Sequence, residues 1–111
     1  MSEFAQRQCK PCEGGVAPMD KSQAEKALGE LADAWSLADD AQSITGEFEF
    51  KNYYQTQAFV NAVAWIAHCQ DHHPDITFGY KNCSIMFTTH AIGGLSDNDF
   101  ICAARVDQLQ Q

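Results

Sequence analysis

The residues of this sequence best suited to acid–base chemistry are its four histidines, all of which lie between His68 and His90. His72 and His73 stand directly before Pro74, which cannot continue a helix, so we expect them where a helix ends. His90 comes shortly before a glycine pair and is expected where a strand gives way to a loop. Catalytic groups concentrate at such element ends. Because imidazole has an ordinary pKa of about 6.5, the set suits a reaction with two proton transfers.

Two other interpretations of the histidines stay open. Histidines in these positions also serve as surface or helix-capping residues, and short motifs often arise by chance. Three histidines with an open coordination position describe a hydrolytic zinc site, in which Asp71, Asp75 and Asp99 could hydrogen-bond to the ligands. Adjacent side chains on an extended segment point apart, however, so His72 and His73 do not easily share one metal with the third histidine. We therefore expect acid–base chemistry without a metal.

The five cysteines do not form a recognisable metal or disulfide pattern. Cys9 and Cys12 make a lone CxxC, whereas a structural zinc site needs four ligands. Cys69, Cys83 or Cys102 could complete such a site, but a pair of cysteines in an irregular arm is the simpler interpretation. An odd count without an export signal argues against a disulfide framework. Self-association is then the expected source of extra stability for so small a core.

Length and charge narrow the function further. A chain of 111 residues has the length of a single domain. Its formal charge of −8 disfavours direct binding to the negatively charged backbone of nucleic acid. No segment approaches the roughly 20 apolar residues of a membrane helix, and the first residues lack the apolar core of a secretory signal. We therefore expect a cytoplasmic protein that binds neither nucleic acid nor membrane.

The elements that must position the histidines follow from hydrophobic periodicity. Proline and glycine punctuate residues 1–19, which predicts an irregular N-terminal arm before a single domain at 20–111. Within the domain the pattern predicts a first helix, which a capping box at Ser22 and Glu25 begins and which ends near Asp33, followed by strands at 35–37 and 44–50. A long helix is then expected from Asn52 to before His72. Strands at 76–80 and 83–90 follow around a turn at Lys81-Asn82, and a last helix starts at Ser96.

This order, α-β-β-α-β-β-α, predicts an α+β fold. Strands joined as hairpins and meanders favour a four-stranded antiparallel sheet, with the three helices on one face. The strands at 35–37 and 44–50 contain no proline that would protect an exposed sheet edge, so we expect one of them, or the long helix, to make the contact of a homodimer or homotetramer.

The stretch from His68 to Asp99 resembles the pterin-4a-carbinolamine dehydratases. The matching motifs are His68, His72-His73-Pro74, Tyr80, Thr89-His90 and Gly94-Leu95-Ser96-Asp97-Asn98-Asp99, with Trp35 and Phe48-Glu49-Phe50-Lys51-Asn52-Tyr53 upstream. The resemblance covers roughly residues 20–109. Two positions depart from the family pattern, which commonly has glutamate at His68 and an acidic residue at Ala91.

The resemblance implies dehydration of a 4a-hydroxy-tetrahydropterin to the quinonoid dihydropterin, in the recycling of the pterin used by aromatic amino-acid hydroxylases. It implies no cofactor and no metal. By analogy His72, His73 and His90 are catalytic, with His73 the main acid–base group and His90 positioning and polarising. The residues implied in substrate binding are these three histidines with Asp71, Thr88, Thr89 and Ala91, and those implied in support are His68, Tyr80 and Asp99.

The resemblance also implies partners. They are the pterin itself, a second copy of the chain, and an aromatic amino-acid hydroxylase. An alternative from another class is a non-catalytic regulatory partner of a hydroxylase or of a transcription factor. A pure adaptor would have no need of the full histidine set, which favours the enzyme.

Overall fold

The structure, a computed structural model, describes residues 3–10 and 17–110. Its elements follow in the order η1 (Glu3–Gln6), α1 (Lys21–Leu28), β1 (Trp35–Leu37), β2 (Ile44–Glu49), α2 (Tyr53–Gln70), β3 (Asp75–Phe78), β4 (Asn82–Phe87), η2 (His90–Ile92) and α3 (Asp97–Gln108), where η marks a short 3-10 helix. From α1 onward the helices and strands alternate as α-β-β-α-β-β-α, which confirms the predicted α+β fold.

The four strands form one antiparallel sheet in the order β1-β2-β4-β3. The register pairs Trp35 with Gly46, and a Cβ at Gly46 would stand only 3.0 Å from the Trp35 ring. Glycine therefore lets the indole lie flat across the neighbouring strand. The expectation that residues 44–50 offer an exposed edge is wrong, because β2 pairs with β1 on one side and with β4 on the other. Within the described residues, β1 and β3 are the edges of the sheet.

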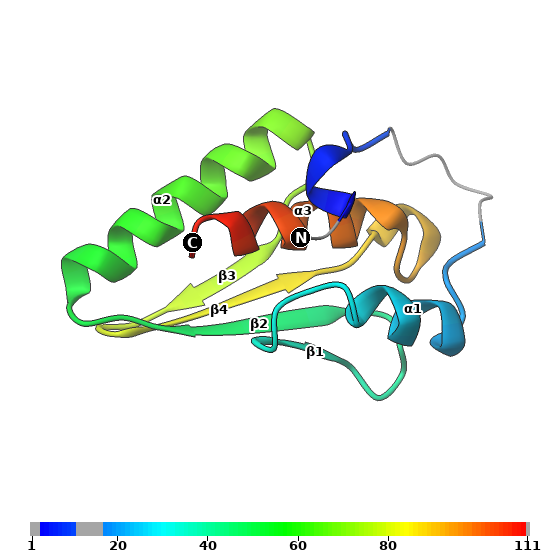
Figure 1. The fold of residues 1–111 in the computed structure, drawn as a ribbon, viewed down its shortest axis with the longest axis horizontal. Coiled ribbons are helices and arrows are strands. Elements are labelled where there is room, and N and C mark those ends of the chain that lie inside the picture. The colour runs from blue at the N-terminus through cyan, green and yellow to red at the C-terminus, as the bar shows by residue number, and fades with distance from the viewer. Residues whose placement is uncertain (1–2, 11–16, 111) are drawn as a thin grey trace.

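Alternation along the strands separates a buried face from an open one. On β2 the side chains of Ile44 and Phe48 are buried, and on β4 those of Ile85 and Phe87 are buried. The helices cover this face, and Figure 1 shows α2 and α3 lying on the same side of the sheet. One contiguous core results, to which α1 contributes small side chains and α3 contributes most of its length.

The first helix differs from its prediction at both ends. Its N-cap is Asp20, whose carboxylate accepts the Gln23 backbone N–H at 2.8 Å while the Gln23 side chain bonds back to the Asp20 N–H. The capping box is thus two residues earlier than the Ser22 spacing suggested. The helix ends at Leu28 rather than near Asp33, because Gly29 follows as its C-cap.

The long helix follows its prediction. Asn52 is the N-cap of α2 and accepts the Gln55 backbone N–H at 2.9 Å. Phe59, Val63 and Ala67 form the buried stripe of the helix. The helix ends at Gln70, before the histidine pair, as the proline predicted. No helix among residues 3–10 and 17–110 is long and apolar enough to cross a membrane.

The second hairpin is shorter than predicted. β3 ends at Phe78 and β4 runs from Asn82 to Phe87, so the turn spans residues 79–81 and Asn82 already belongs to the strand. Beyond β4, Thr89 forms an isolated bridge with Gly94, and Gly93 between them has a positive φ of 67°. This closed loop, rather than a continued strand, carries His90.

The N-terminal arm is more ordered than predicted. Residues 3–6 form η1, so the expectation of an irregular arm is wrong there. Phe4 and Ala5 are buried, and the Phe4 ring lies 5.8 Å from that of Phe100 on α3. Cys12 and the glycines beside it lie outside the described residues.

Candidate active site

A cavity of about 210 Å³ opens where the end of α2, the end of β4 and η2 meet. The residues that line it are Asp71, His72, His73, Thr88, Thr89, His90 and Ala91. The structure thus brings together the three histidines proposed for catalysis and the four residues proposed with them for substrate binding. They come from two segments, 71–73 and 88–91, which the hairpin of β3 and β4 separates.

The end of α2 aims the histidine pair. Asp71 takes a left-handed conformation with φ 51° and ψ 43°, which aspartate tolerates better than most residues. The His72 N–H then bonds to Ala67 O at 3.2 Å, and the Asp71 N–H bonds to His68 O at 3.3 Å. These two bonds make a Schellman motif, which satisfies the last carbonyls of the helix and turns the chain sharply. The turn leaves His72 and His73 at the cavity.

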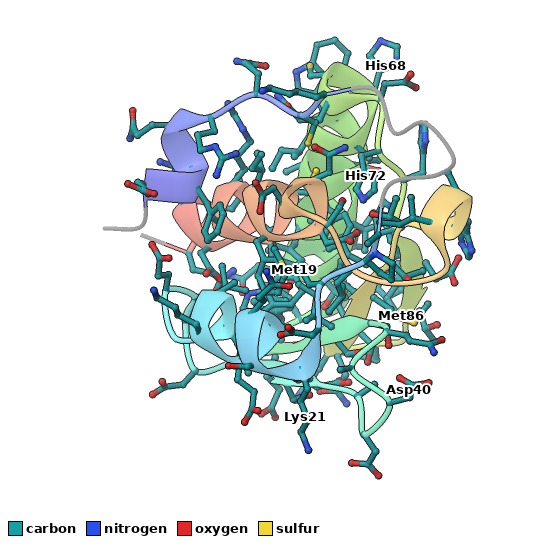
Figure 2. All side chains as sticks on the ribbon, turned by 90° about the vertical axis from the view of Figure 1, so that its right-hand side faces the viewer. Met19, Lys21, Asp40, His68, His72 and Met86 are labelled. Atoms are coloured by element: carbon teal, nitrogen blue, oxygen red, sulfur yellow. The ribbon has the colours of Figure 1, made fainter. Side chains whose placement is uncertain are left out.

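His72 is held by a buried carboxylate. Its Nε2 lies 2.6 Å from Oδ1 of Asp99, with 11% of the His72 side chain and none of the Asp99 side chain exposed. The His72 ring also stacks on Phe87, with the planes 8° apart and the centroids at 6.0 Å. Figure 2 shows His72 lying inward beside α3. One hydrogen bond and one ring face therefore fix the orientation of this imidazole.

The first turn of α3 in turn fixes Asp99. Its Oδ2 accepts the Thr89 hydroxyl at 2.7 Å and the Ser96 backbone N–H at 3.0 Å, the second as part of a capping box. The hydroxyls of Thr89 and Ser96 are also 2.8 Å apart. A carboxylate in this position is favoured by the dipole of the helix as well as by its donors. The network links α2, β4 and α3 through one side chain.

Two opposing effects act on the protonation of His72. Burial lowers the pKa of His72, but its hydrogen bond to Asp99 and the negative charge of that carboxylate together raise it above the ordinary value. Cys9 and Asp71 add smaller effects in the same direction. The site therefore favours the imidazolium form of His72 more than water does.

The remaining lining residues differ in how strongly they are held. His73, His90, Asp71 and Ala91 are exposed at the cavity. The Thr88 hydroxyl donates to Gln42 O at 2.6 Å, so its proton is already engaged within the protein.

Two residues proposed as supporting do not reach the cavity. Tyr80 lies in the turn after β3, where its ring contacts Tyr53 at the start of α2, so it stands at the opposite end of the long helix from the histidine pair. His68 is exposed and stacks on Trp65 at 5.2 Å. Figure 2 shows His68 at the outer end of α2, pointing away from His72. Asp99, the third of this group, contacts His72 directly.

Sequence reasoning missed three residues that act on the pair of His72 and Asp99: Phe87 stacks on His72, Ser96 donates to Asp99, and Cys9 raises the pKa of His72. Phe87 was expected only as part of a strand, Ser96 only as a helix start, and Cys9 only as part of an irregular arm. The Ser96-x-x-Asp99 spacing could have shown that the carboxylate turns back toward the helix start. No sequence pattern pairs it with a histidine 27 positions away. Among residues 3–10 and 17–110, no three His, Cys, Asp or Glu side chains lie close enough together to hold a metal ion.

The sequence of this chain is similar to those of known proteins along most of its length. Residues 17–109 match the family model described as pterin 4 alpha carbinolamine dehydratase. A proposed pterin-4-alpha-carbinolamine dehydratase of Nitrosomonas eutropha is 62% identical over 107 residues, which cover 96% of this chain and 93% of that one. A relative of the same name from Nitrosospira multiformis is 55% identical over all of this chain and 96% of its own.

Two solved structures share the fold. The transcriptional coactivator/pterin dehydratase from Brucella melitensis superimposes with a TM-score of 0.79 at 26% identity, over 85% of this chain and 99% of that one. A pterin dehydratase-like protein identified as a RuBisCO assembly factor in the alpha-carboxysome gives a TM-score of 0.59 at 28% identity, over 68% and 88%. With the family match over most of the domain, these likenesses show that the chain belongs to the pterin-4a-carbinolamine dehydratase family.

Proposed function

We propose that this protein dehydrates a 4a-hydroxy-tetrahydropterin to the quinonoid dihydropterin and water. The observation that carries the proposal is the arrangement of His72, oriented by a fully buried Asp99, beside His73 and His90 at one cavity. Membership of a family named for this reaction supports it. So does the chemistry, because the reaction moves two protons and requires groups that exchange protons near neutral pH.

The reaction breaks the C4a–O bond and the N5–H bond and forms a double bond between C4a and N5. We assign the proton for the departing hydroxyl to His72, since the raised pKa of this residue favours its protonated form. His73, on the exposed side of the cavity, accepts the proton from N5, and His90 polarises the hydroxyl. Acid–base catalysis by positioned side chains typically contributes about 10²–10⁴-fold. The ring nitrogen supplies the electron pair that expels the hydroxyl.

The other lining residues hold the substrate. Asp71 and the Thr88 oxygen present acceptors to the N–H groups of a pterin, while Thr89 acts mainly through Asp99. Ala91 leaves room at the rim where the family commonly has an acidic side chain, so we expect a difference in pterin side-chain preference rather than in the reaction.

Stopped-flow absorbance tests the activity. A 4a-hydroxy-tetrahydropterin generated chemically decays on its own, and the full-length protein should accelerate the appearance of the quinonoid product. His73→Ala/His90→Ala is the matched control, since both side chains are exposed at the cavity rather than packed in the core. A decay rate equal with and without the wild-type protein, at enzyme concentrations up to that of the substrate, would exclude the proposed activity.

The substrate of the proposed reaction suggests which enzyme supplies it. Aromatic amino-acid hydroxylases generate 4a-hydroxy-tetrahydropterins, so we propose that this protein serves such a hydroxylase by returning its pterin to the reducible form. Adding the protein to an assay of such a hydroxylase, in which the pterin is limiting, should raise the sustained rate of hydroxylation. The same assay with the His73→Ala/His90→Ala variant separates catalysis from physical association with the hydroxylase.

A binding role is the second candidate. Relatives of the same fold are described as a transcriptional coactivator and as a RuBisCO assembly factor. The open face of the sheet, which includes the exposed Glu47 and Glu49 of β2, is a surface through which such a role could act. Retention of partner binding by the double histidine variant would assign that role to a surface separate from the cavity.

We also propose that the chain self-associates. Within the described residues the sheet has free edges at β1 and β3, and exposed aromatic side chains lie near the β3 edge, with Tyr80 65% and Tyr53 44% exposed. An unprotected edge beside apolar surface favours pairing with a second copy of the chain.

A further inference from the structure

Two cysteines that the proposed reaction does not use lie side by side. The Sγ atoms of Cys9 and Cys102 are 3.6 Å apart, and both residues are free thiols. Cys9 belongs to the N-terminal arm and is half-buried, whereas Cys102 is buried on α3, one helical turn beyond Asp99. Figure 1 shows the N-terminal segment lying against α3. The pair therefore joins two parts of the chain that lie 93 positions apart.

Hydrogen bonds on both sides hold Cys9 in place. Its backbone N–H donates to Oε1 of Gln70, the last residue of α2, at 2.8 Å. The next residue, Lys10, exchanges two hydrogen bonds with the side chain of Asn98, which lies in the first turn of α3. Arg105, further along α3, donates to Arg7 O at 2.6 Å. The closeness of the two sulfur atoms thus results from several contacts along the arm.

The two sulfur atoms differ in chemical character. The hydrogen bond from Cys102 lowers the pKa of Cys9, burial opposes this, and the positive charges of His72 and Arg105 lower it further. The pKa of Cys102 is raised, first by that same hydrogen bond and then by burial. A half-buried cysteine with a lowered pKa, next to a buried thiol, is an arrangement that suits cysteines that sense oxidants.

We propose that Cys9 and Cys102 form a redox-modification site that reacts with hydrogen peroxide or an organic hydroperoxide and closes a disulfide between the N-terminal arm and α3. Cys9 is the attacking residue, because it is the accessible one of the two. Cys102 is the resolving residue. The site is spatially separate from the pterin cavity, since neither thiol lines it.

The reaction balances with the peroxide as the only oxidant. The Cys9 thiolate attacks one peroxide oxygen, the O–O bond breaks, and the departing hydroxide or alkoxide takes a proton to leave as water or alcohol. Cys9 is now a sulfenic acid. The Cys102 sulfur then attacks the Cys9 sulfur, the S–O bond breaks, and the released hydroxide takes the Cys102 proton to form water. Two thiols are oxidised by two electrons, and one peroxide is reduced.

The disulfide would act on the neighbouring site in two ways. It would tie the arm covalently to the helix that carries Asp99. It would also remove the thiolate charge that helps raise the pKa of His72. The expected consequence is a lower pKa for His72 in the oxidised protein than in the reduced protein, which a histidine NMR titration reports without any turnover.

Thiol counting tests the proposal. The fully reduced protein is treated with stoichiometric hydrogen peroxide, the remaining thiols are alkylated, and the intact mass is measured. Two of the five thiols should disappear, with a mass loss of two hydrogen atoms and no added oxygen, and a thiol reductant should restore them. A product that carries only sulfinic or sulfonic acid, or that keeps all five thiols, would overturn the proposal.

Variants identify the pair. Trypsin leaves Cys9 with Cys12 in one fragment and Cys83 with Cys102 in another, because no cleavable Lys or Arg bond separates either pair. Single substitutions are therefore needed. Cys9→Ser and Cys102→Ala should each abolish the intramolecular disulfide, while Cys12→Ser and the control Cys83→Ala should retain it. A disulfide that persists in Cys102→Ala and vanishes in Cys12→Ser would show that the CxxC pair closes instead.

Folding controls keep the outcome interpretable. Cys102 is buried, so the circular dichroism and melting curve of Cys102→Ala are compared with wild type before oxidation. Cys9→Ser changes a half-buried residue that only packs against the edge of the core, so it provides an independent test. In the wild-type protein the disulfide should raise Tm, because it constrains the unfolded chain across a long loop, and an unchanged Tm on full oxidation would count against a bond between these two residues.

Discussion

Replacing Asp99 with Asn changes the protonation of His72 with little change in shape. The carboxylate makes three hydrogen bonds, from His72 Nε2, from the Thr89 hydroxyl and from the Ser96 N–H. An amide keeps the bonds to Thr89 and Ser96 if its oxygen faces them. Its NH2 group then faces His72, so the imidazole must accept a hydrogen bond there. The variant therefore favours neutral His72.

The expected loss of stability follows from the contact that is replaced. Hydrogen bonds to charged groups contribute about 1.5–3 kcal/mol each and neutral ones about 0.5–1.5 kcal/mol, and the Asn variant exchanges the charged bond to His72 for a neutral one. We therefore expect this exchange to lower the free energy of unfolding by about 1–1.5 kcal/mol near pH 6. Asp99→Ala should cost roughly 3–5 kcal/mol, because it leaves the partners of a fully buried side chain without any acceptor.

The stability that the pair of His72 and Asp99 provides depends on pH. The folded pKa of His72 is raised, so its pairing with Asp99 stabilises the protein fully below the unfolded pKa of about 6.5 and is lost as the pH rises through the folded value. In Asp99→Asn the two effects of Asp99 are gone, and burial, the largest single effect on the pKa of His72, is opposed only by the smaller effects of Cys9 and Asp71, so this pKa falls. The difference in stability between wild type and variant should therefore be largest near pH 6 and smaller at pH 9.

Urea unfolding monitored by tryptophan fluorescence at pH 6, 7, 8 and 9 measures this difference, and an NMR titration of His72 measures the pKa directly. Catalysis should fall by about two orders of magnitude in kcat/KM, the loss expected when an acid is disabled. Asp97→Asn is the matched control. It lies in the same helical turn, and its ion pair with Arg7 is at the surface, so its cost should be within about 1 kcal/mol. A stability difference that grows with pH, or an unchanged pKa of His72, would refute the reasoning.

The other predictions concern catalysis, metals and assembly. His73→Ala should lower kcat/KM by about two orders of magnitude or more. The double variant with His90→Ala should lose less kcat/KM than the product of the two single losses, because both residues act on one step. Wild-type rates in His73→Ala would show that this residue has no part in the mechanism. Dehydratase activity should survive a strong chelator, whereas loss on chelation and recovery with zinc would replace the acid–base mechanism with a metal one. Sedimentation at micromolar concentration should show a dimer or larger assembly, and a single species of 12.3 kDa would contradict the proposed self-association.

The sequence by itself determined the elements and the chemical character of the site. Apolar residues at a period of 2 or of 3.6 located the strands and the helices, because each element buries one face and its own sequence must therefore carry that spacing. Pro74 placed the end of α2, and Asn52 placed its beginning. The histidine motif and its spacing indicated the family, and the seven residues implied in substrate binding lie together at one cavity.

Only the tertiary structure decided which groups act on one another. Nothing near His72 in the sequence shows that Asp99 holds it, because that pairing requires α3 to pack across the end of α2. Tyr80 belongs to the same sequence motif as the histidines yet lies at the far end of α2, because a β-hairpin carries its turn away from its ends. Cys9 was expected in an irregular arm and is instead in contact with Cys102. Hydrophobic pattern and capping are local and can be predicted from neighbouring residues, whereas contacts between distant segments depend on how the packed elements cross.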